Sequence, residues 1–207
     1  MSLIVHHLNN SRSQRILWML EELGLPYEIR HYERDPQTML APASLRQVHP
    51  LGKSPVLEDG SLKLVETGAI CEYLVEKTGR LGPAADTESR LRYRQFLHYA
   101  EGSVMPPLLL KLGFSKIPLL GKVAMRKVQP MIDVHLDYIE QELKSRPWFA
   151  GDNLTAADVM MSFPLEAACS RAGLGPSRPA TMAWLKKVHD RPTYKAALKK
   201  GGPYDYA

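Results

Sequence analysis

Strand signals are confined to the first third of this chain, and the rest is helical in pattern. The predicted strands cover residues 2–6, 26–31, 55–57 and 62–65, and the predicted helices between them cover 13–23, 43–48 and 67–78. Asp59-Gly60 lies between two apolar runs, which is a strong hairpin signal. This order predicts a small α/β domain with a mixed four-stranded sheet over residues 1–82.

After a linker of about eight residues, apolar positions recur at helical spacing. The predicted helices cover residues 88–112, 122–143, a buried segment from 156 onward, and 181–200. Pro106-Pro107 must kink or interrupt the first of them. Thr155 and Asp158 have the spacing of a capping box, and the tail from Gly201 is expected to fray. Residues 83–207 therefore form a predicted all-helical domain.

Composition excludes several classes of protein. The 207 residues are 44% apolar, which is enough for a core, and no run approaches 18 apolar residues. The N-terminus lacks the layout of a secretory signal, so we expect a cytoplasmic protein without a membrane span. Two cysteines lie 98 positions apart, and the histidines show no metal-ligand spacing. We expect no metal site.

The net charge of +5 is unevenly distributed along the chain. Residues 1–82 carry 9 basic and 10 acidic side chains, whereas residues 83–207 carry 18 and 12. The basic residues of the second part occur singly or in pairs between apolar positions, which is typical of solvated helix faces. Nucleic-acid binding is therefore not expected.

The turn after the first predicted strand places Ser11 just before the first predicted helix. Unpaired backbone N–H groups and the helix dipole favour an anion at this point. Ser11 is therefore a candidate for contacting an anionic ligand. The alternative is that Ser11 only caps the helix and forms a capping box with Gln14.

A second candidate segment is Ser54-Pro55, at the start of the third predicted strand. A proline is tolerated at this position because it need not donate to the strand ladder. If the bond before Pro55 is cis, the backbone groups of Ser54 turn outward and can pair with an extended peptide. The alternative is an ordinary proline between loop and strand.

A third candidate segment is Glu66-Thr67, at the start of the helix over 67–78. A carboxylate can accept from an ammonium group, and a hydroxyl with a backbone N–H can donate to a carboxylate. Together they could hold both ends of an amino-acid zwitterion. The alternative is that Thr67 caps the helix while Glu66 complements its dipole.

With these segments in this order, the chain resembles the cytosolic glutathione transferase superfamily. The resemblance spans essentially the whole chain and rests on the Ser11 turn, Gly-Lys-Ser-Pro-Val-Leu at 52–57, Glu-Thr-Gly-Ala-Ile at 66–70 and Asn-Leu-Thr-Ala-Ala-Asp at 153–158. Residues 11–18 and 21–27, together with residues 99–103 and Pro106-Pro107, look like a serine-type microbial subgroup related to theta-like enzymes. The resemblance implies a thioredoxin-like N-terminal domain followed by an all-helical C-terminal domain.

The resemblance also implies which residues bind glutathione. Ser11 corresponds to the serine that donates a hydrogen bond to the glutathione sulfur, with Asn10 and Ser13 as alternatives. Ser54 replaces the apolar residue that usually precedes the proline, although a contact through its backbone should survive this change. Position 11 holds neither tyrosine nor cysteine, which disfavours the tyrosine-type and thiol-exchanging classes. The implied glutathione contacts are Lys53, Ser54, Glu66 and Thr67.

The implied activity is conjugation of glutathione, as co-substrate, to a small hydrophobic electrophile by a homodimer. Candidate electrophile-pocket residues are Tyr99, Met105 and Leu109, for which the alternative is plain helix-packing core. Alternative functions are a glutathione-dependent peroxidase, or a low-turnover protein that binds glutathione or hydrophobic ligands.

Overall fold

The computed structural model describes residues 2–118 and 120–207. Two compact units are present. Unit 1 contains the chain up to Leu81 together with Asp190–Asp205, and unit 2 contains Gly82–His189 together with Tyr206. The sequence-based boundary after residue 82 lies next to the first of these limits. The segment 190–205, assigned from sequence to the helical domain, groups with unit 1.

Unit 1 is built on a four-stranded sheet of order β2-β1-β3-β4. Its strands are β1 (Leu3–Leu8), β2 (Tyr27–Tyr32), β3 (Val56–Asp59) and β4 (Leu62–Leu64). Strand β1 pairs in parallel with β2 and antiparallel with β3, and β3 pairs antiparallel with β4. The predicted mixed sheet is therefore confirmed, and so is the hairpin at Asp59-Gly60.

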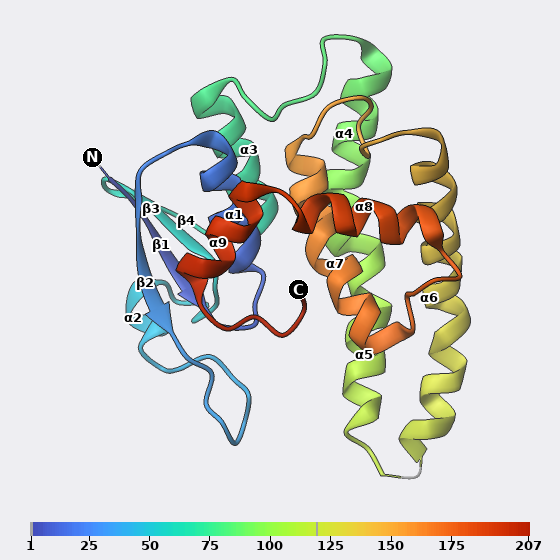
Figure 1. Ribbon diagram of the computed structural model, residues 1–207. Coiled ribbons are helices and arrows are strands. Elements are labelled where there is room, and N and C mark those ends of the chain that lie inside the picture. The colour runs from blue at the N-terminus through green and yellow to red at the C-terminus, as the bar shows by residue number, and fades with distance from the viewer. Residues whose placement is uncertain (1, 119) are drawn as a thin grey trace. The chain divides into compact units, whose positions relative to one another are not determined.

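Three helices of unit 1 pack together beside the sheet (Figure 1). They are α1 (Ser13–Leu23), α3 (Thr67–Thr78) and α9 (Pro192–Gly201), while a short helix α2 (Leu45–Val48) precedes β3. Helix α1 ends where predicted, at Gly24, whose φ of 65° is the left-handed conformation that glycine adopts readily. Apolar spacing together with terminating glycines thus located α1 and α3.

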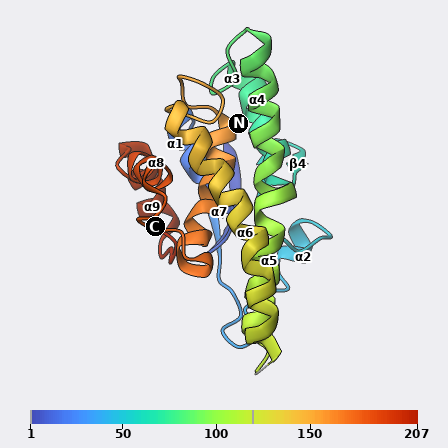
Figure 2. The ribbon, with the colours of Figure 1, turned by 90° about the vertical axis from the view of Figure 1, so that its right-hand side faces the viewer.

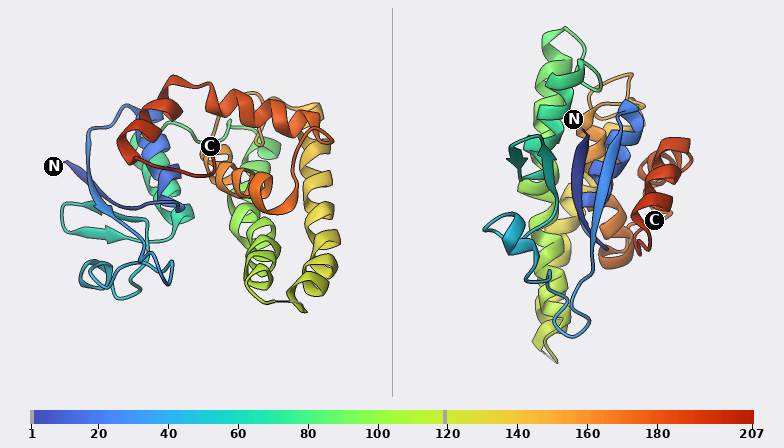
Figure 3. Two further views of the ribbon diagram at one scale, coloured as in Figure 1. Left: turned by 60° about the horizontal axis from the view of Figure 1, so that its bottom comes forward. Right: turned by 90° about the vertical axis from the view of Figure 1, so that its left-hand side faces the viewer.

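Helix α9 comes from the far end of the chain and lies next to α1 (Figure 3). The Trp18 and Tyr194 rings meet edge to face, with centroids 5.5 Å apart. Arg191 at the start of α9 binds the half-buried carboxylate of Glu22, with Nη2 and Oε2 2.8 Å apart. An aromatic pair and an ion pair therefore fasten the C-terminal segment to unit 1.

Unit 2 is helical, as predicted. Its elements are α4 (Thr87–Tyr99), a π-helical segment (Ala100–Val104), α5 (Met105–Ser115), α6 (Leu120–Ser145), α7 (Ala156–Ala172) and α8 (Pro179–His189). Figure 2 shows α4 and α5 following one another, with α6 alongside. The predicted interruption at Pro106-Pro107 takes the form of the π-helical segment, with the prolines in the first turn of α5.

The capping box before α7 is confirmed. The buried carboxylate of Asp158 accepts from the backbone N–H of Thr155 at 2.9 Å and from its hydroxyl at 3.0 Å. Its other oxygen accepts from the backbone N–H of Phe149 at 2.9 Å. One carboxylate thus fixes both the start of α7 and the loop before it.

Candidate functional site

The three predicted binding segments leave the sheet of unit 1 at the same end. Strand β1 runs toward the Ser11 turn, and its His6 pairs with Val56 at the start of β3, just after Ser54. Strand β4 is antiparallel to β3, with Leu64 opposite Leu57, so β4 also ends at this side, just before Glu66. The strand registers therefore bring the segments together, as the hypothesis of one binding site requires.

Ser11 lies in the turn between β1 and α1 and is 5% exposed. Its Oγ accepts from the backbone N–H of Ser13 at 3.2 Å and lies 2.8 Å from the Ser13 Oγ. Helix α1 begins at Ser13 with Arg12 at the N-cap position, and the Gln14 amide is buried without a hydrogen-bond partner among the described residues. The alternative that Ser11 and Gln14 form a capping box is wrong.

The two alternatives to Ser11 are both engaged elsewhere. Ser13 is 0% exposed, and its Oγ lies 2.9 Å from Nδ1 of His7 and accepts from the backbone N–H of Leu8 at 3.2 Å. The Asn10 amide is paired with Asp205 near the C-terminus. Of the two paired serines, Ser11 is the more exposed, at 5% against 0% for Ser13. Ser11 is therefore the member of the pair nearer to the protein surface.

The Ser54 side chain is anchored to the end of β1. Its Oγ donates to the carbonyl of His6 at 2.8 Å and accepts from the backbone N–H of Leu8 at 3.2 Å. Ser13 and Ser54 thus share the Leu8 donor, which ties the two segments to one point of the strand. The Ser54-Pro55 peptide bond is cis, and Lys53 beside it is exposed.

Glu66 is exposed and has a φ of 69°, an uncommon value for a residue with a side chain. It holds the N-cap position of α3, and Thr67 is the buried first residue of that helix. The alternative in which Thr67 is the cap is therefore wrong. Strained backbone of this kind persists where the surrounding structure enforces it and is concentrated at binding sites.

The three candidate electrophile-pocket residues lie on unit 2 in different environments. The Tyr99 hydroxyl is 2.6 Å from Nδ1 of His135 on α6, and burial raises the pKa of Tyr99 to about 12. Met105 is 1% exposed, as the helix-packing alternative predicts, whereas Leu109 is 44% exposed. These three residues do not share one environment within unit 2.

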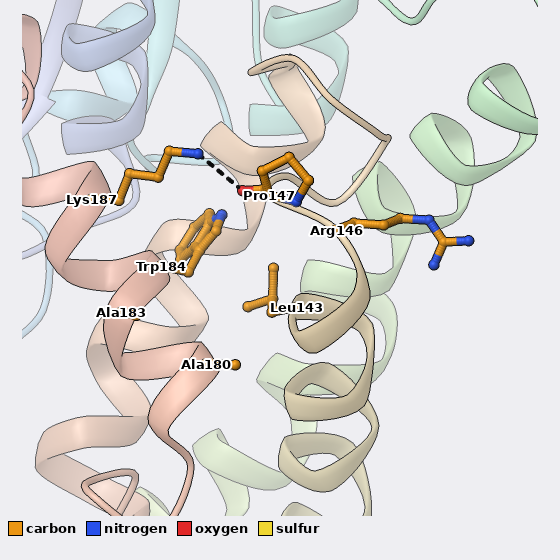
Figure 4. A pocket seen from close by; sticks show the side chains of 7 residues that line it. All are labelled: Leu143, Arg146, Pro147, Ala180, Ala183, Trp184 and Lys187. Atoms are coloured by element: carbon orange, nitrogen blue, oxygen red, sulfur yellow. Dashed lines mark hydrogen bonds between the residues drawn. The ribbon is translucent and has the colours of Figure 1, made fainter.

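Unit 2 also contains a cavity of about 190 Å³ between the end of α6 and α8 (Figure 4). It is lined by Leu143, Arg146, Pro147, Ala180, Ala183, Trp184 and Lys187. The Lys187 Nζ donates to the Pro147 carbonyl at 3.3 Å and lies 3.8 Å from the centre of the Trp148 ring. None of the predicted site residues lines this cavity.

His7 lies next to the Ser11 turn, although it is not among the candidates predicted from the sequence. It is 2% exposed, and burial together with neighbouring His31 lowers its pKa to about 4. A signal was available, since His7 continues the inward alternation of Leu3 and Val5 on β1. A polar side chain at such a position has to find a buried partner, here Ser13.

Two further observations concern the described residues, 2–118 and 120–207. None of the helices there is long and apolar enough to cross a membrane. That part of the chain also holds no cluster of three or more His, Cys, Asp or Glu side chains placed to bind a metal ion.

The chain matches known proteins over nearly its whole length. Family models for the glutathione S-transferase N-terminal and C-terminal domains match residues 1–76 and 120–192. Glutathione S-transferase 3 of Schizosaccharomyces pombe is 36% identical, over 96% of this chain and 87% of that protein. Glutathione S-transferase 1 of Saccharomyces cerevisiae is 34% identical, over 95% of this chain and 94% of that protein.

A solved structure agrees with these matches. The crystal structure of a glutathione S-transferase from Actinobacillus pleuropneumoniae superposes with a TM-score of 0.89 at 33% identity, covering 99% of this chain and 95% of that one. The family models, the relatives and this structure place the chain in the glutathione S-transferase family.

Proposed function

We propose that this transferase binds glutathione at the end of the unit 1 sheet where its three segments meet, with the Ser11 hydroxyl donating to the sulfur. The observation that carries the proposal is the position of Ser11, at the outer end of a buried serine pair just before α1. The first backbone N–H groups of a helix and its dipole favour an anion there.

The magnitudes support the Ser11 hydroxyl as the main stabiliser of a thiolate. A thiol with a pKa near 8.5 is only about 3% ionised at pH 7. Lowering that pKa by two units requires about 2.7 kcal/mol of preferential interaction with the anion. One hydrogen bond to a charged group contributes about 1.5–3 kcal/mol, and the helix end adds about 0.3–1 kcal/mol. One hydroxyl and one helix end are therefore sufficient.

The remaining candidates match the other parts of glutathione, which is a peptide with two carboxylates and one ammonium group. Ser54 offers its backbone N–H and C=O to the peptide part, because its side chain is turned toward β1. Glu66 would accept from the ammonium group, and Thr67 with the start of α3 would donate to the neighbouring carboxylate. The exposed ammonium of Lys53 complements the second carboxylate.

The reaction is a nucleophilic substitution or addition at an electrophilic carbon. The thiolate donates an electron pair to form the carbon–sulfur bond, and in a substitution the leaving group departs with the electrons of its own bond. Among the candidates on unit 2, Leu109 offers an exposed apolar side chain and Tyr99 a hydroxyl. Met105 contributes through packing.

We propose that the active form is a homodimer and that the enzyme belongs to a serine-type group of microbial transferases. Exposed large apolar side chains on α4, α5 and α6 support association of two copies. They include Leu91, Leu109, Leu110, Met131 and Val134. Light scattering on the purified protein measures the state directly, and a monomer at micromolar concentration would contradict the proposal.

The decisive experiment for the site is a crystal structure with bound glutathione. We expect the sulfur within hydrogen-bond distance of the Ser11 Oγ, the peptide part beside the backbone of Ser54, and the amino-acid end at Glu66 and Thr67. Turnover of a chlorinated dinitroaromatic by the same preparation separates conjugation from mere binding. A sulfur placed nearer to Asn10 or Ser13 would contradict the assignment to Ser11.

A further inference from the structure

A continuous row of buried polar groups leads from Ser11 into the interior of unit 1. The Ser11 and Ser13 Oγ atoms are 2.8 Å apart, and the Ser13 Oγ is 2.9 Å from Nδ1 of His7. On its far side His7 is hydrogen-bonded to the backbone of Gly201, the last residue of α9. The row thus connects the proposed sulfur site to the C-terminal helix through two hydroxyls and an imidazole.

The backbone of Gly201 determines which ring nitrogen of His7 carries the proton. The hydrogen bond between Gly201 and His7 raises the pKa of His7, so it favours the charged imidazole. A backbone carbonyl, which accepts from a ring N–H, has this effect. The Nε2 atom lies on this side, only 3.3 Å from where a side chain on Gly201 would begin. In neutral His7 the proton is therefore on Nε2, and Nδ1 is an acceptor.

This tautomer sets the direction of every donor in the row. Ser13 donates to Nδ1 of His7 at 2.9 Å in preference to the carbonyl of Leu8, which is farther away at 3.3 Å. The short contact between the serines is then filled by the Ser11 proton, donated to Ser13. The Ser11 Oγ itself accepts from the backbone N–H of Ser13. In the free protein the Ser11 proton consequently points inward, away from the position proposed for the sulfur.

Binding of a thiolate conflicts with this arrangement. When Ser11 donates its proton to the sulfur, it can no longer donate to Ser13. The 2.8 Å hydrogen bond between the two serines then persists only if Ser13 donates to Ser11. Because the Ser13 proton is now directed to Ser11, Ser13 can no longer donate to Nδ1 of His7. The hydrogen bond between Ser13 and His7 then requires a proton on Nδ1. An imidazolium satisfies all of these groups at once, because Nδ1–H donates to Ser13 and Nε2–H donates to the carbonyl of Gly201.

We propose that His7 is a positioning residue for the thiolate, since it takes up the proton that leaves the glutathione thiol and so turns the Ser11 hydroxyl toward the sulfur. The inference rests on the proposed function of Ser11. The thiol proton passes to the Ser11 Oγ, the Ser11 proton to the Ser13 Oγ, and the Ser13 proton to Nδ1 of His7. The S–H electron pair stays on sulfur, and the products are a thiolate and an imidazolium.

The surroundings of His7 keep it neutral until the anion arrives. His31 faces it from β2 with ring centroids 5.8 Å apart, α1 contributes the neutral Ser13 and Gln14, and α9 contributes the backbone of Gly201. Burial and His31 hold the pKa of His7 at about 4. To be half protonated at pH 7 beside the thiolate, the imidazole has to gain about three pKa units.

A buried anion at the other end of the row acts in that direction, and so does the Ser13 oxygen, which accepts from Nδ1–H of the imidazolium once Ser13 donates to Ser11. The coupling is reciprocal, so the imidazolium lowers the thiol pKa by as many units as the thiolate raises that of His7. His7 thus gives the site a proton acceptor that responds to the bound thiolate.

The test compares the protons released into solution with the thiolate formed on binding glutathione. Thiolate is measured by its ultraviolet absorbance, and proton release by a pH indicator in weak buffer. At pH 7 the wild-type protein should release fewer protons than the thiolate it forms. In His7→Gln, whose side chain cannot hold the proton, the two numbers should agree. Equal proton release per thiolate in the wild-type protein and His7→Gln would overturn the proposal.

Controls separate this inference from the function on which it rests. His98→Gln removes an exposed histidine of α4 and should retain protons as the wild-type protein does. If His7→Gln fails to fold, as judged by circular dichroism, His7→Phe replaces it with the same expectation. Ser11→Ala should form at least tenfold less thiolate at pH 7. Full thiolate formation in Ser11→Ala would instead overturn the proposed function, and with it this inference.

Discussion

Two hydrogen bonds join the Asn10 side chain to Asp205, which lies 195 positions further along the chain. Nδ2 of Asn10 donates to Oδ2 of Asp205 at 2.6 Å, and Oδ1 accepts from the Asp205 backbone N–H at 2.8 Å. Asn10 precedes Ser11 and has a φ of 50°, so the C-terminal tail clamps the strained part of this turn. The expectation that the tail frays from Gly201 is not met at Asp205.

Removing this clamp should weaken glutathione binding more than folding. Asp205→Ala loses the side-chain bond and keeps the backbone one, at a cost of about 0.5–1 kcal/mol in orienting the turn. We therefore expect the KM for glutathione to rise about two- to fivefold, with kcat nearly unchanged. Steady-state kinetics measure this, with Asp152→Ala, an exposed aspartate of unit 2, as control. An unchanged KM would show that the tail does not support the turn.

Ser11→Ala should lower kcat/KM for conjugation about 10- to 100-fold, because it removes a charge-assisted hydrogen bond worth about 1.5–3 kcal/mol. Folding should change little, since the Ser13 Oγ keeps His7 and the backbone of Leu8 as partners. Ser61→Ala, in the exposed β3–β4 turn, is the matched control. If Ser11→Ala keeps the wild-type rate, Asn10 or Ser13 becomes the sulfur contact to test.

Much of the fold could be predicted because its signals are local. Gly24 ends α1, Asp59-Gly60 forms the hairpin, and Thr155 with Asp158 starts α7, each within a few residues of the element it defines. The grouping of α9 with unit 1 could not be read in this way. It depends on contacts such as that between Glu22 and Arg191, which are 169 positions apart.

The candidate site could be predicted only in part, for the same reason. Sequence spacing brought out Ser11, Ser54 and Glu66 as segments, and the strand registers then showed that they share one end of the sheet. The hydrogen-bond network behind Ser11 could not be predicted. It runs from Ser13 to His7 and on to Gly201 near the C-terminus, and no local sequence pattern relates a buried strand histidine to a C-terminal glycine.

Substitutions at Glu66 should change the KM for glutathione and the free energy of unfolding independently of each other. Glu66→Gly removes the carboxylate but suits the positive φ of this position, where a residue with a side chain is strained by about 1–3 kcal/mol. We expect a raised KM for glutathione together with a free energy of unfolding no lower than wild type. Glu66→Gln should raise KM without relieving the strain. A normal KM in both variants would exclude the carboxylate from glutathione binding.

Asp158 should give the protein a stability that falls as pH rises. Burial raises its pKa to about 6, above the unfolded value near 4. Below about pH 4 both states are protonated, and between about pH 4 and 6 only the folded state keeps the proton. This contribution is therefore lost as pH increases through that window, by at most about 3 kcal/mol.

Urea unfolding across the same pH range measures the Asp158 effect. Asp158→Asn cannot ionise and should lose this component of the slope. It should also be less stable than wild type at every pH, because one amide oxygen cannot serve the donors from Phe149 and Thr155. Asp152→Asn, an exposed residue, should leave the pH profile unchanged. An Asp158→Asn profile that parallels wild type would mean that folding does not raise the pKa of Asp158.

At Gly201 even the smallest side chain should destabilise the fold. A Cβ there would lie 2.7 Å from the Gln14 Oε1, 2.9 Å from the Leu17 Cδ1 and 3.3 Å from Nε2 of His7. Gly201→Ala therefore has to displace the buried side chains of Gln14 and Leu17 or move α9 away from α1, and we expect a loss of about 1–3 kcal/mol in the free energy of unfolding. Gly113→Ala is the matched control, because a Cβ there meets nothing within 4 Å. Since alanine is also the better helix former, Gly113→Ala should gain up to about 1 kcal/mol. Opposite signs for the same chemical change would identify the contact of α9 with α1, and not helix propensity, as the reason for glycine at position 201.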